Sequence, residues 1–344
     1  MHFKIYNIIG EVKSGTTLVG TLLDSHSDIT TIPIELKLIS HFMKKKDLND
    51  KDLLKYYLNR TRLKHLEVNE KIRSKREFRV INGIFKIKEF NFEKFQKLVL
   101  NEKIVNYSQK RIINIIIHIH KHFELSQNKK LKKNIIIQDG NHILQNFNSI
   151  QKKFPEIKNI LVFRNPLDIY SSLKKITEIT KDFYFSINSF GNKESNILKV
   201  TKLIEKDRKD IFYIKYEDLV ESPKKIMFNL SKFLSIKFSK SLLKPTFINS
   251  DWYGNSSSEK KIYGIKNTRI DLYKKKLNIN EIRYLSYKFK ILLETKYNFK
   301  KIKKYNLITI LSVYLTNFNL FSKNCDKDYK YPIRLVKFFY KLIF

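Results

Sequence analysis

The residues GEVKSGTT, at positions 10–17, have the composition of a phosphate-binding loop. Gly10 and Gly15 have the spacing of a nucleoside-triphosphate loop, but that loop carries lysine directly after its second glycine, where this chain has Thr16. The lysine here is Lys13, inside the loop. Main-chain amides and hydroxyls at the start of the next helix would face an anion, and they belong to Ser14, Gly15, Thr16 and Thr17. The arrangement favours a 5′-phosphate with one further charged group over a triphosphate.

A second anion-binding pattern lies in NILVFRNPLDIYSSLKK, at 159–175. Arg164 ends an apolar run, and Asn165 and Pro166 are suited to cap and open the next helix. Ser172 falls about two turns along that helix. An arginine fork at a strand tip and a nearby hydroxyl can hold one phosphate from two sides. The alternative is a structural arginine that caps the edge of a sheet.

These two motifs resemble the nucleotide site of sulfotransferases that use 3′-phosphoadenosine 5′-phosphosulfate (PAPS). The stretch KSGTTLVGTLLDSHSDI (13–29) resembles the family's 5′-phosphosulfate loop, and Arg164 and Ser172 match its 3′-phosphate pattern. The resemblance covers roughly residues 3–40 and 134–290. It implies a P-loop sulfotransferase domain with PAPS as co-substrate and no metal in the chemistry.

Later segments extend the resemblance. The YEDL turn that begins at Tyr216 resembles the turn after the family's late strand, which implies that Tyr216 approaches the adenine or ribose. The loop PTFINSDWYGNSSS (245–258) resembles a late loop of bacterial members, which implies that Asn255 and Ser256 close over the nucleotide. The segment GIKNTRIDLYKKKLNINEIRYL (264–285) continues the likeness.

The resemblance also implies which residues carry the chemistry. Lys13 and the helix N-terminus would stabilise the charge that grows on the bridging oxygen during sulfuryl transfer. Glu35, in TIPIELKLI (31–39), stands where many members place the glutamate that takes the acceptor's proton. The alternative for Glu35 is a carboxylate at the start of a helix near Leu36.

The chain departs from the family after its second apolar run. Many relatives carry a lysine-bearing triplet there, near the sulfate, whereas this chain has Asp139, Gly140 and Asn141. His142 follows, and it is the second candidate: it could donate a hydrogen bond in place of the lysine or replace Glu35 as the base. The alternative for His142 is a solvent-facing histidine at a helix start.

Four short apolar runs predict the strands that position these motifs, at 3–9, 134–138, 159–163 and 211–215. None alternates strictly, which is typical of strands covered on both faces in a parallel sheet. Helix-like segments follow them, at 16–26, 143–154, 166–178 and 224–234. The alternation predicts an α/β, P-loop-containing fold of three layers around a central, mainly parallel sheet.

Residues 44–130 have dense charge and apolar residues at helical intervals, which predicts a helical insertion that lines the acceptor site. We expect a sulfotransferase domain at 1–300, which includes this insertion, and a C-terminal helical extension at 301–344.

Three histidines in the insertion raise the question of a metal. His118, His120 and His122 would share one face of a strand, which suits a metal, whereas on a helix only His118 and His122 align. The surrounding charge pattern favours the helix, so we expect no metal site.

The formal net charge of +36 does not by itself indicate a nucleic-acid partner. The chain has no alanine and is rich in Lys, Ile, Asn and Phe along its whole length, so the charge follows the composition. It will still attract anionic ligands, glycans and membrane surfaces in a salt-dependent way. The single cysteine, Cys325, excludes an intramolecular disulfide and favours a reducing compartment.

The sequence favours a cytoplasmic protein. The apolar run at 3–9 reads as a strand rather than a secretory signal, and the longest apolar stretch, 306–321, is short for a membrane span. The tail at 331–344 mixes basic and aromatic residues, so it would either pack against the domain or lie on a membrane surface.

The sequence therefore predicts an enzyme that moves a sulfuryl group from PAPS to a hydroxyl or amine of a glycan, lipid or small molecule. A P-loop kinase or NTPase is one alternative, and it would require a lysine at position 16 and a carboxylate for magnesium, such as Asp139. The other is a non-catalytic basic protein that binds anionic membranes or polysaccharides without a saturable PAPS site.

Overall fold

The structure of the chain is a computed structural model that describes residues 2–61, 63, 91–141, 143–180, 187–248, 250–252 and 264–289. The chain divides into two compact units, Met1–Lys276 and Leu277–Phe344. The second unit contributes helix α13 (Ile279–Lys288) to the described residues. All other elements described below belong to the first unit.

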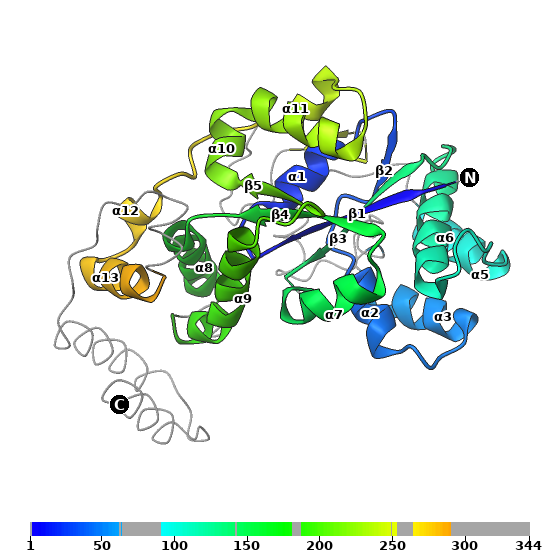
Figure 1. Cartoon of the computed structure of the whole chain (residues 1–344), viewed down its shortest axis with the longest axis horizontal. Coiled ribbons are helices and arrows are strands. Elements are labelled where there is room, and N and C mark those ends of the chain that lie inside the picture. Colours follow the sequence, from blue (N-terminus) through cyan, green and yellow to red (C-terminus); the bar gives the residue numbers. More distant parts are fainter. Residues whose placement is uncertain are drawn as a thin grey trace. The chain divides into compact units, whose positions relative to one another are not determined.

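A five-stranded parallel sheet forms the centre of the first unit (Figure 1). Its order is β2-β3-β1-β4-β5. The bounds are β1 (Lys4–Gly10), β2 (Ile29–Thr31), β3 (Asn134–Gly140), β4 (Ile157–Phe163) and β5 (Ile211–Lys215). The four predicted strands are confirmed as β1, β3, β4 and β5. After β1 the chain moves to one side for β2 and β3, then to the other for β4 and β5. Such a switch point leaves a crevice at the carboxyl ends of the central strands.

Helices cover both faces of this sheet, which confirms the predicted three-layer α/β class (Figure 1). On one face, α1, α10 and α11 bury an apolar cluster that includes Ile8, Leu22 and Met227. Figure 1 shows α7, α8 and α9 on the other face. The described helices of the first unit are α1 (Thr16–Leu23), α2 (Leu38–Lys44), α3 (Asp50–Arg60), α5 (Phe92–Asn101), α6 (Arg111–Ser126), α7 (Phe147–Lys153), α8 (Pro166–Thr180), α9 (Ile187–Glu205), α10 (Tyr216–Glu221), α11 (Pro223–Leu234) and α12 (Tyr273–Lys276).

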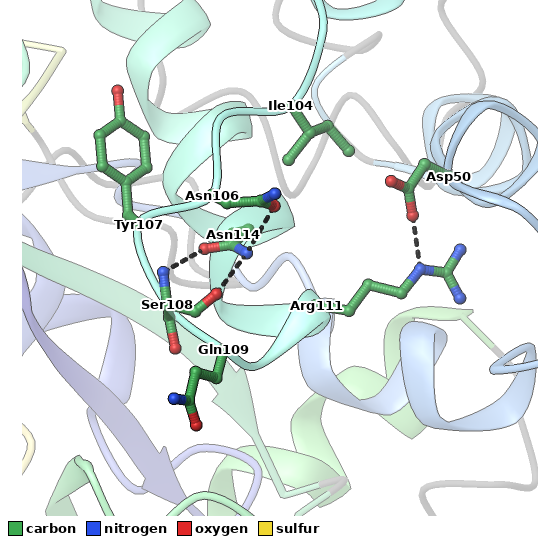
Figure 2. Close-up of a pocket in the computed structure, with 8 residues that line it drawn as sticks. All are labelled: Asp50, Ile104, Asn106, Tyr107, Ser108, Gln109, Arg111 and Asn114. Atoms are coloured by element: carbon green, nitrogen blue, oxygen red, sulfur yellow. Dashed lines mark hydrogen bonds and ion pairs between the residues drawn. The ribbon is translucent and has the colours of Figure 1, made fainter.

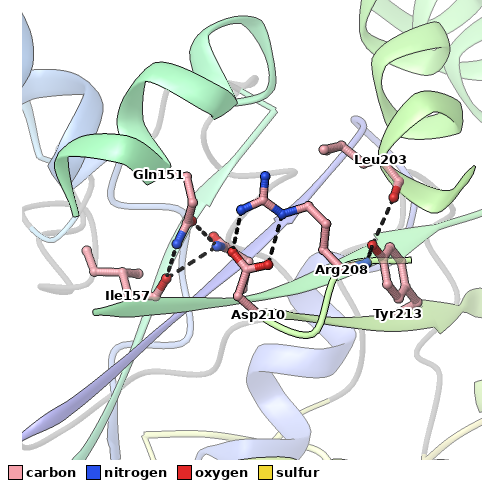
Figure 3. A network of polar contacts seen from close by, with 7 residues as sticks. Gln151, Ile157, Leu203, Arg208, Asp210 and Tyr213 are labelled. Carbon is pink, nitrogen blue, oxygen red and sulfur yellow. Dashed lines mark hydrogen bonds and ion pairs between the residues drawn. The ribbon is translucent and has the colours of Figure 1, made fainter. Parts of the chain in front are cut away.

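Structural polar contacts hold the amino end of β5 (Figure 3). Arg208 forms a two-pronged pair with Asp210, with Nε–Oδ1 and Nη2–Oδ2 distances of 2.9 and 2.7 Å. The hydroxyl of Tyr213 donates to the carbonyl of Leu203 at 2.8 Å and accepts from the amide of Arg208 at 3.0 Å. These bonds fix the end of α9 against the sheet.

The described part of segment 44–130 forms the helices α3, α5 and α6. Residues 62 and 64–90 of that segment lie outside the described residues, as does the segment 301–344. The boundaries predicted at 300 and 301 therefore stay a prediction. No helix in the described part of the chain is long and apolar enough to cross a membrane. The stretches 306–321 and 331–344 lie outside that part.

The histidines of α6 are helical, as the charge pattern predicted. The rings of His118 and His122 lie 4.3 Å apart, while His120 bonds separately, through Nδ1 to the carbonyl of Ile116 at 2.8 Å. All three side chains are buried. Over the described ranges, no cluster of three or more His, Cys, Asp or Glu could hold a metal ion.

Acidification below about pH 6.5 should destabilise the fold through these histidines. Burial lowers the pKa of His118, and it lowers the pKa of His120 and His122 to about 4. Between those pH values the unfolded chain binds more protons than the folded chain, so the free energy of unfolding falls as the pH falls. Urea unfolding at a series of pH values measures the decline. His120→Gln should make it shallower, and an unchanged slope in that variant would contradict the assignment.

Candidate active site

The loop between β1 and α1 is tightly folded at the carboxyl edge of the sheet. Gly15 has φ +107°, and it is the residue before the first turn of α1, which has no side-chain cap. A Cβ at Gly10 would lie 2.4 Å from the carbonyl oxygen of Val162 on the neighbouring β4. Both glycines are therefore required by the backbone: one by its left-handed conformation, the other by the close approach of a strand. The uncapped amides of α1 are left at the crevice, where they suit an anion.

Lys13 and Ser14 carry the loop's functional groups. The side chain of Ser14 is fully buried, and its Oγ has no hydrogen-bond partner in the described part of the chain. Burial, together with the positive charges of Arg269 and Arg164, lowers the pKa of Lys13 to about 8. A buried hydroxyl without a partner and a desolvated cation are both stabilised by an added anion. Thr16 and Thr17 are half-buried at the start of α1.

Arg164 follows β4 and lies against this loop. Its Nη1 donates to the carbonyl of Lys13 at 3.3 Å, and its Nη2 donates to the carbonyl of Arg269. Its guanidinium carbon lies 4.4 Å from the centre of the Tyr216 ring, a cation–π contact. Nε is buried and has no partner in the described residues. Thus the two motifs predicted from the sequence lie in one place, and the arginine joins them.

Ser172 is less closely placed. It lies on α8 and is half-buried. Within the described contacts, no hydrogen bond joins it to Arg164. The neighbouring Ser171 instead serves the helix, since its Oγ donates to the carbonyl of Asp168 at 3.0 Å. The pairing of Arg164 with Ser172 on one phosphate therefore stays a prediction.

Arg269 is a third cation of this site, and the sequence did not single it out. It lies 105 residues from Arg164, in the segment 264–285, whose resemblance to the family assigned no role to a single residue. Asp168 on α8 holds that segment: its two carboxylate oxygens accept the amides of Asp271 and Tyr273, both at 3.0 Å. Burial lowers the pKa of Arg269, and the charge of Arg164 adds to the shift. Only the fold brings these cations together.

Tyr216 and Glu217, at the start of α10, contact the β1–α1 loop and the turn after β4. Tyr216 is buried, and a Cβ at Gly15 would lie 2.6 Å from its ring. Glu217 accepts the amide of Asn165 at 3.0 Å through Oε1, so it holds the turn after β4, as expected of an acidic residue in the YEDL turn. Asn165 in turn caps α8 by accepting the amide of Leu167 at 2.9 Å.

Glu35 lies at the carboxyl end of β3, next to β1. A Cβ at Gly140, which has φ +60°, would lie 2.7 Å from Glu35 Oε1, so the carboxylate lies directly over this glycine. The amide of Leu36 donates to the carbonyl of Gln138 at 3.0 Å and fixes the segment there. Because β1 and β3 are adjacent and parallel, Glu35 and Lys13 belong to the same edge of the sheet.

A second carboxyl lies beside Glu35. Asp139 is fully buried, and its Oδ2 accepts the amide of Ile39 at 3.3 Å. Burial, with a further contribution from the charge of Glu35, raises the pKa of Asp139 to about 8. His142, Asn255 and Ser256 lie outside the described residues, so their roles stay predictions.

Comparison with known proteins decides the class. The model of the sulfotransferase family matches residues 7–240, more than half of the chain. This chain belongs to the sulfotransferase family. The match covers the β1–α1 loop, Glu35, Arg164 and Tyr216 of this sulfotransferase, and it decides against the kinase alternative. The protein is thus an enzyme of sulfuryl transfer with the predicted P-loop-like fold. No curated protein matches the chain.

Three solved sulfotransferases match this chain at low sequence identity. The domain from the curacin biosynthetic pathway is 13% identical, with 81% of this chain and 93% of that chain covered and a TM-score of 0.40. The domain from the Synechococcus PCC 7002 olefin synthase is 14% identical, with 92% and 94% covered and a TM-score of 0.39. For STF9 from Mycobacterium avium the values are 12%, 86%, 77% and 0.41. At these scores the likeness adds nothing to the family match.

Gly15→Ala should disrupt the loop. The left-handed conformation costs a residue with Cβ about 1–2 kcal/mol, and the methyl group would also overlap the Tyr216 ring. We expect a lower melting temperature and loss of anion binding. Gly264→Ala is the matched control, because Gly264 has φ +69° but nothing lies within 4 Å of its Cβ position. Equal effects of the two substitutions on binding would show that contact with Tyr216 does not matter.

Proposed function

We propose that this sulfotransferase moves a sulfuryl group from PAPS to a hydroxyl or amine of its acceptor. The observation that carries the proposal is the convergence of three cations, Lys13, Arg164 and Arg269, with the Tyr216 ring against Arg164. Three neighbouring cations and an aromatic ring suit a ligand with more than one anionic group and a flat base. A nucleotide with a phosphosulfate on one side of its ribose and a phosphate on the other has these features.

The residues divide into two binding groups. Lys13 and the residues Ser14 to Thr17 would hold the phosphosulfate with the lysine charge, the α1 amides and the hydroxyls. Arg164 and Ser172 would hold the 3′-phosphate, and Arg269, whose carbonyl accepts a hydrogen bond from Arg164, would add a further positive charge. Tyr216 would support the adenosine, with Asn255 and Ser256 closing over it. No metal is needed for this binding, because the cations are supplied by the protein.

The chemistry is a substitution at sulfur. The bond between sulfur and the bridging phosphate oxygen breaks as a bond from sulfur to the acceptor oxygen or nitrogen forms. Lys13 stabilises the charge left on the bridging oxygen. Glu35, one strand away from Lys13, accepts the proton of the acceptor. His142 is the second candidate for this role.

For the acceptor and the cellular location, we propose only a class. A glycan, a lipid or a small molecule fits the chemistry, and a nucleic acid is not part of the proposal. The insertion at 44–130 would line the acceptor site. We propose a cytoplasmic enzyme whose tail at 331–344 contacts a membrane, because this tail mixes basic and aromatic residues.

A transfer assay with radiolabelled PAPS and extracts of the native cell envelope tests the proposal, together with thermal stabilisation by 3′-phosphoadenosine 5′-phosphate (PAP). The protein should label an acceptor and be stabilised saturably by PAP. Arg164→Ala should abolish the stabilisation, whereas Arg208→Ala, which removes an arginine paired with Asp210 far from the site, should not. Glu35→Gln should keep PAP binding and lose activity by roughly a hundredfold or more.

Two outcomes would contradict this assignment. An active Glu35→Gln together with an inactive His142→Ala would make His142 the base. Binding that disappears in high salt, with no saturable stabilisation by PAP, would favour the non-catalytic polyanion-binding alternative.

PAP binding should weaken as the pH rises above about 8. Lys13 loses its proton near that pH in the free protein, and a bound anion stabilises its charged form, so binding takes up a proton. Calorimetry in buffers of different ionisation enthalpy measures this uptake. Lys13→Arg should bind without it, because arginine stays charged. Asp139 also has a pKa of about 8, so proton uptake that persists in Lys13→Arg would assign the effect to Asp139 instead.

A further inference from the structure

A shallow cavity of about 540 Å³ lies between the start of α3, the loop 104–109 and the start of α6 (Figure 2). Its position is fixed by two contacts. The ring of Tyr107 packs edge-on against Phe3, just before β1, with centres 5.1 Å apart. Lys110, next to the cavity, pairs with Glu156, just before β4, at 2.7 Å. The cavity is therefore at the amino edge of the sheet, roughly 23 Å from the carboxyl edge across a seven-residue strand.

A buried amide holds the wall of this cavity in one conformation. Asn114 accepts the amide of Ser108 at 2.7 Å through Oδ1, and its Nδ2 donates to the carbonyl of Ser108 at 2.8 Å. The same Nδ2 donates to Oδ1 of Asn106 at 3.3 Å. Figure 2 shows these three residues facing one another. The loop is thus organised before any ligand arrives, which lowers the entropy cost of binding.

The groups that this loop presents are neutral hydrogen-bonding groups. In the described part of the chain, neither Nδ2 of Asn106 nor the side-chain amide of Gln109 has a hydrogen-bond partner, and both residues are exposed. A carboxamide offers donors and an acceptor side by side. Tyr107 adds an aromatic ring that is 36% exposed, and Ile104 adds a small apolar surface.

The charges that line the cavity are already paired. Arg111 donates to Asp50 through Nε, to the carbonyl of Lys46 at 3.0 Å through Nη1, and to the carbonyl of Leu48 through Nη2. Figure 2 shows this pair on one side of the cavity. Asp50 and Arg111 are the two charged residues among those that line the cavity, so their opposite charges favour neither an anionic nor a cationic ligand. A neutral polar ligand fits this balance of charge.

We propose that this cavity binds a neutral carbohydrate, as one or two sugar units of a glycan. Each sugar hydroxyl both donates and accepts, which matches the carboxamides of Asn106 and Gln109, and the C–H face of a sugar ring can lie on Tyr107. The volume suits a ligand of this size. A peptide would need larger apolar contacts than Ile104 and the tyrosine ring supply. The proposal goes beyond sulfuryl transfer and does not depend on it.

Binding of neutral hexasaccharides tests the proposal, measured by saturation-transfer NMR and calorimetry with the full chain. The probes are the hexamers of β-1,4-glucose, α-1,4-glucose, β-1,4-N-acetylglucosamine and α-1,6-mannose. At least one should bind saturably and keep its affinity in about 0.5 M NaCl, where exposed charge interactions are screened. The double variant Asn106→Ala/Gln109→Ala should lose roughly tenfold or more in affinity. Asn148→Ala, which removes an exposed amide on α7, is the matched control.

Three results would overturn the proposal: no saturable binding of any of the four hexamers, binding that survives in the Asn106→Ala/Gln109→Ala variant, or binding to sulfated and carboxylated glycans alone that is lost in salt. Because no transfer is measured and no nucleotide is present, these results are separate from a failure of the proposed function. An unchanged circular dichroism spectrum and a cooperative melting transition of the double variant would show that its fold is intact.

Discussion

The bond network of Arg164 is the constraint on which the site depends. Its guanidinium reaches the carbonyls of Lys13 and Arg269, two residues that are remote in sequence and both positively charged. Like charges at short range repel, most strongly where water is excluded. Burial lowers the pKa of Lys13 and of Arg269, and this repulsion adds to both shifts. The fold therefore holds a concentration of positive charge that an anion relieves.

Two buried carboxyls lie near these positive charges but, among the described contacts, do not pair with the arginine side chains. Asp168 and Glu217 use their oxygens on main-chain amides, and so they position the segments that carry Arg269 and Arg164. Burial raises the pKa of both. Because their hydrogen bonds go to the backbone, the arginine side chains keep donors for a ligand. At β3, by contrast, Asp139 lies deep and is bonded to the start of α2, while Glu35 lies over Gly140 near the crevice.

The sequence predicted those features that are written locally. Apolar runs without alternation indicated β1, β3, β4 and β5, and the glycines and hydroxyls of the first loop indicated its turn. A short strand is expected after the first helix, but the three residues of β2 carry no pattern that identifies its neighbour in the sheet. Its place beside β3 is set by tertiary pairing. Arg269 was not predicted for the same reason: its segment is held at the site by Asp168, which lies on a helix remote in the sequence. The histidines show the converse: their alternate spacing suggested a strand, and the charge around them correctly indicated a helix.

The parallel sheet separates its two edges by a fixed length. In a parallel sheet every strand points the same way, so the nucleotide loop and the loop at 104–109 lie at opposite ends of the same strands. A strand cannot gain or lose one residue without turning its side chains to the wrong face. The strand length therefore fixes the distance between the two edges. A polymer bound at both edges would be modified at a constant distance from the unit that is held at the amino edge.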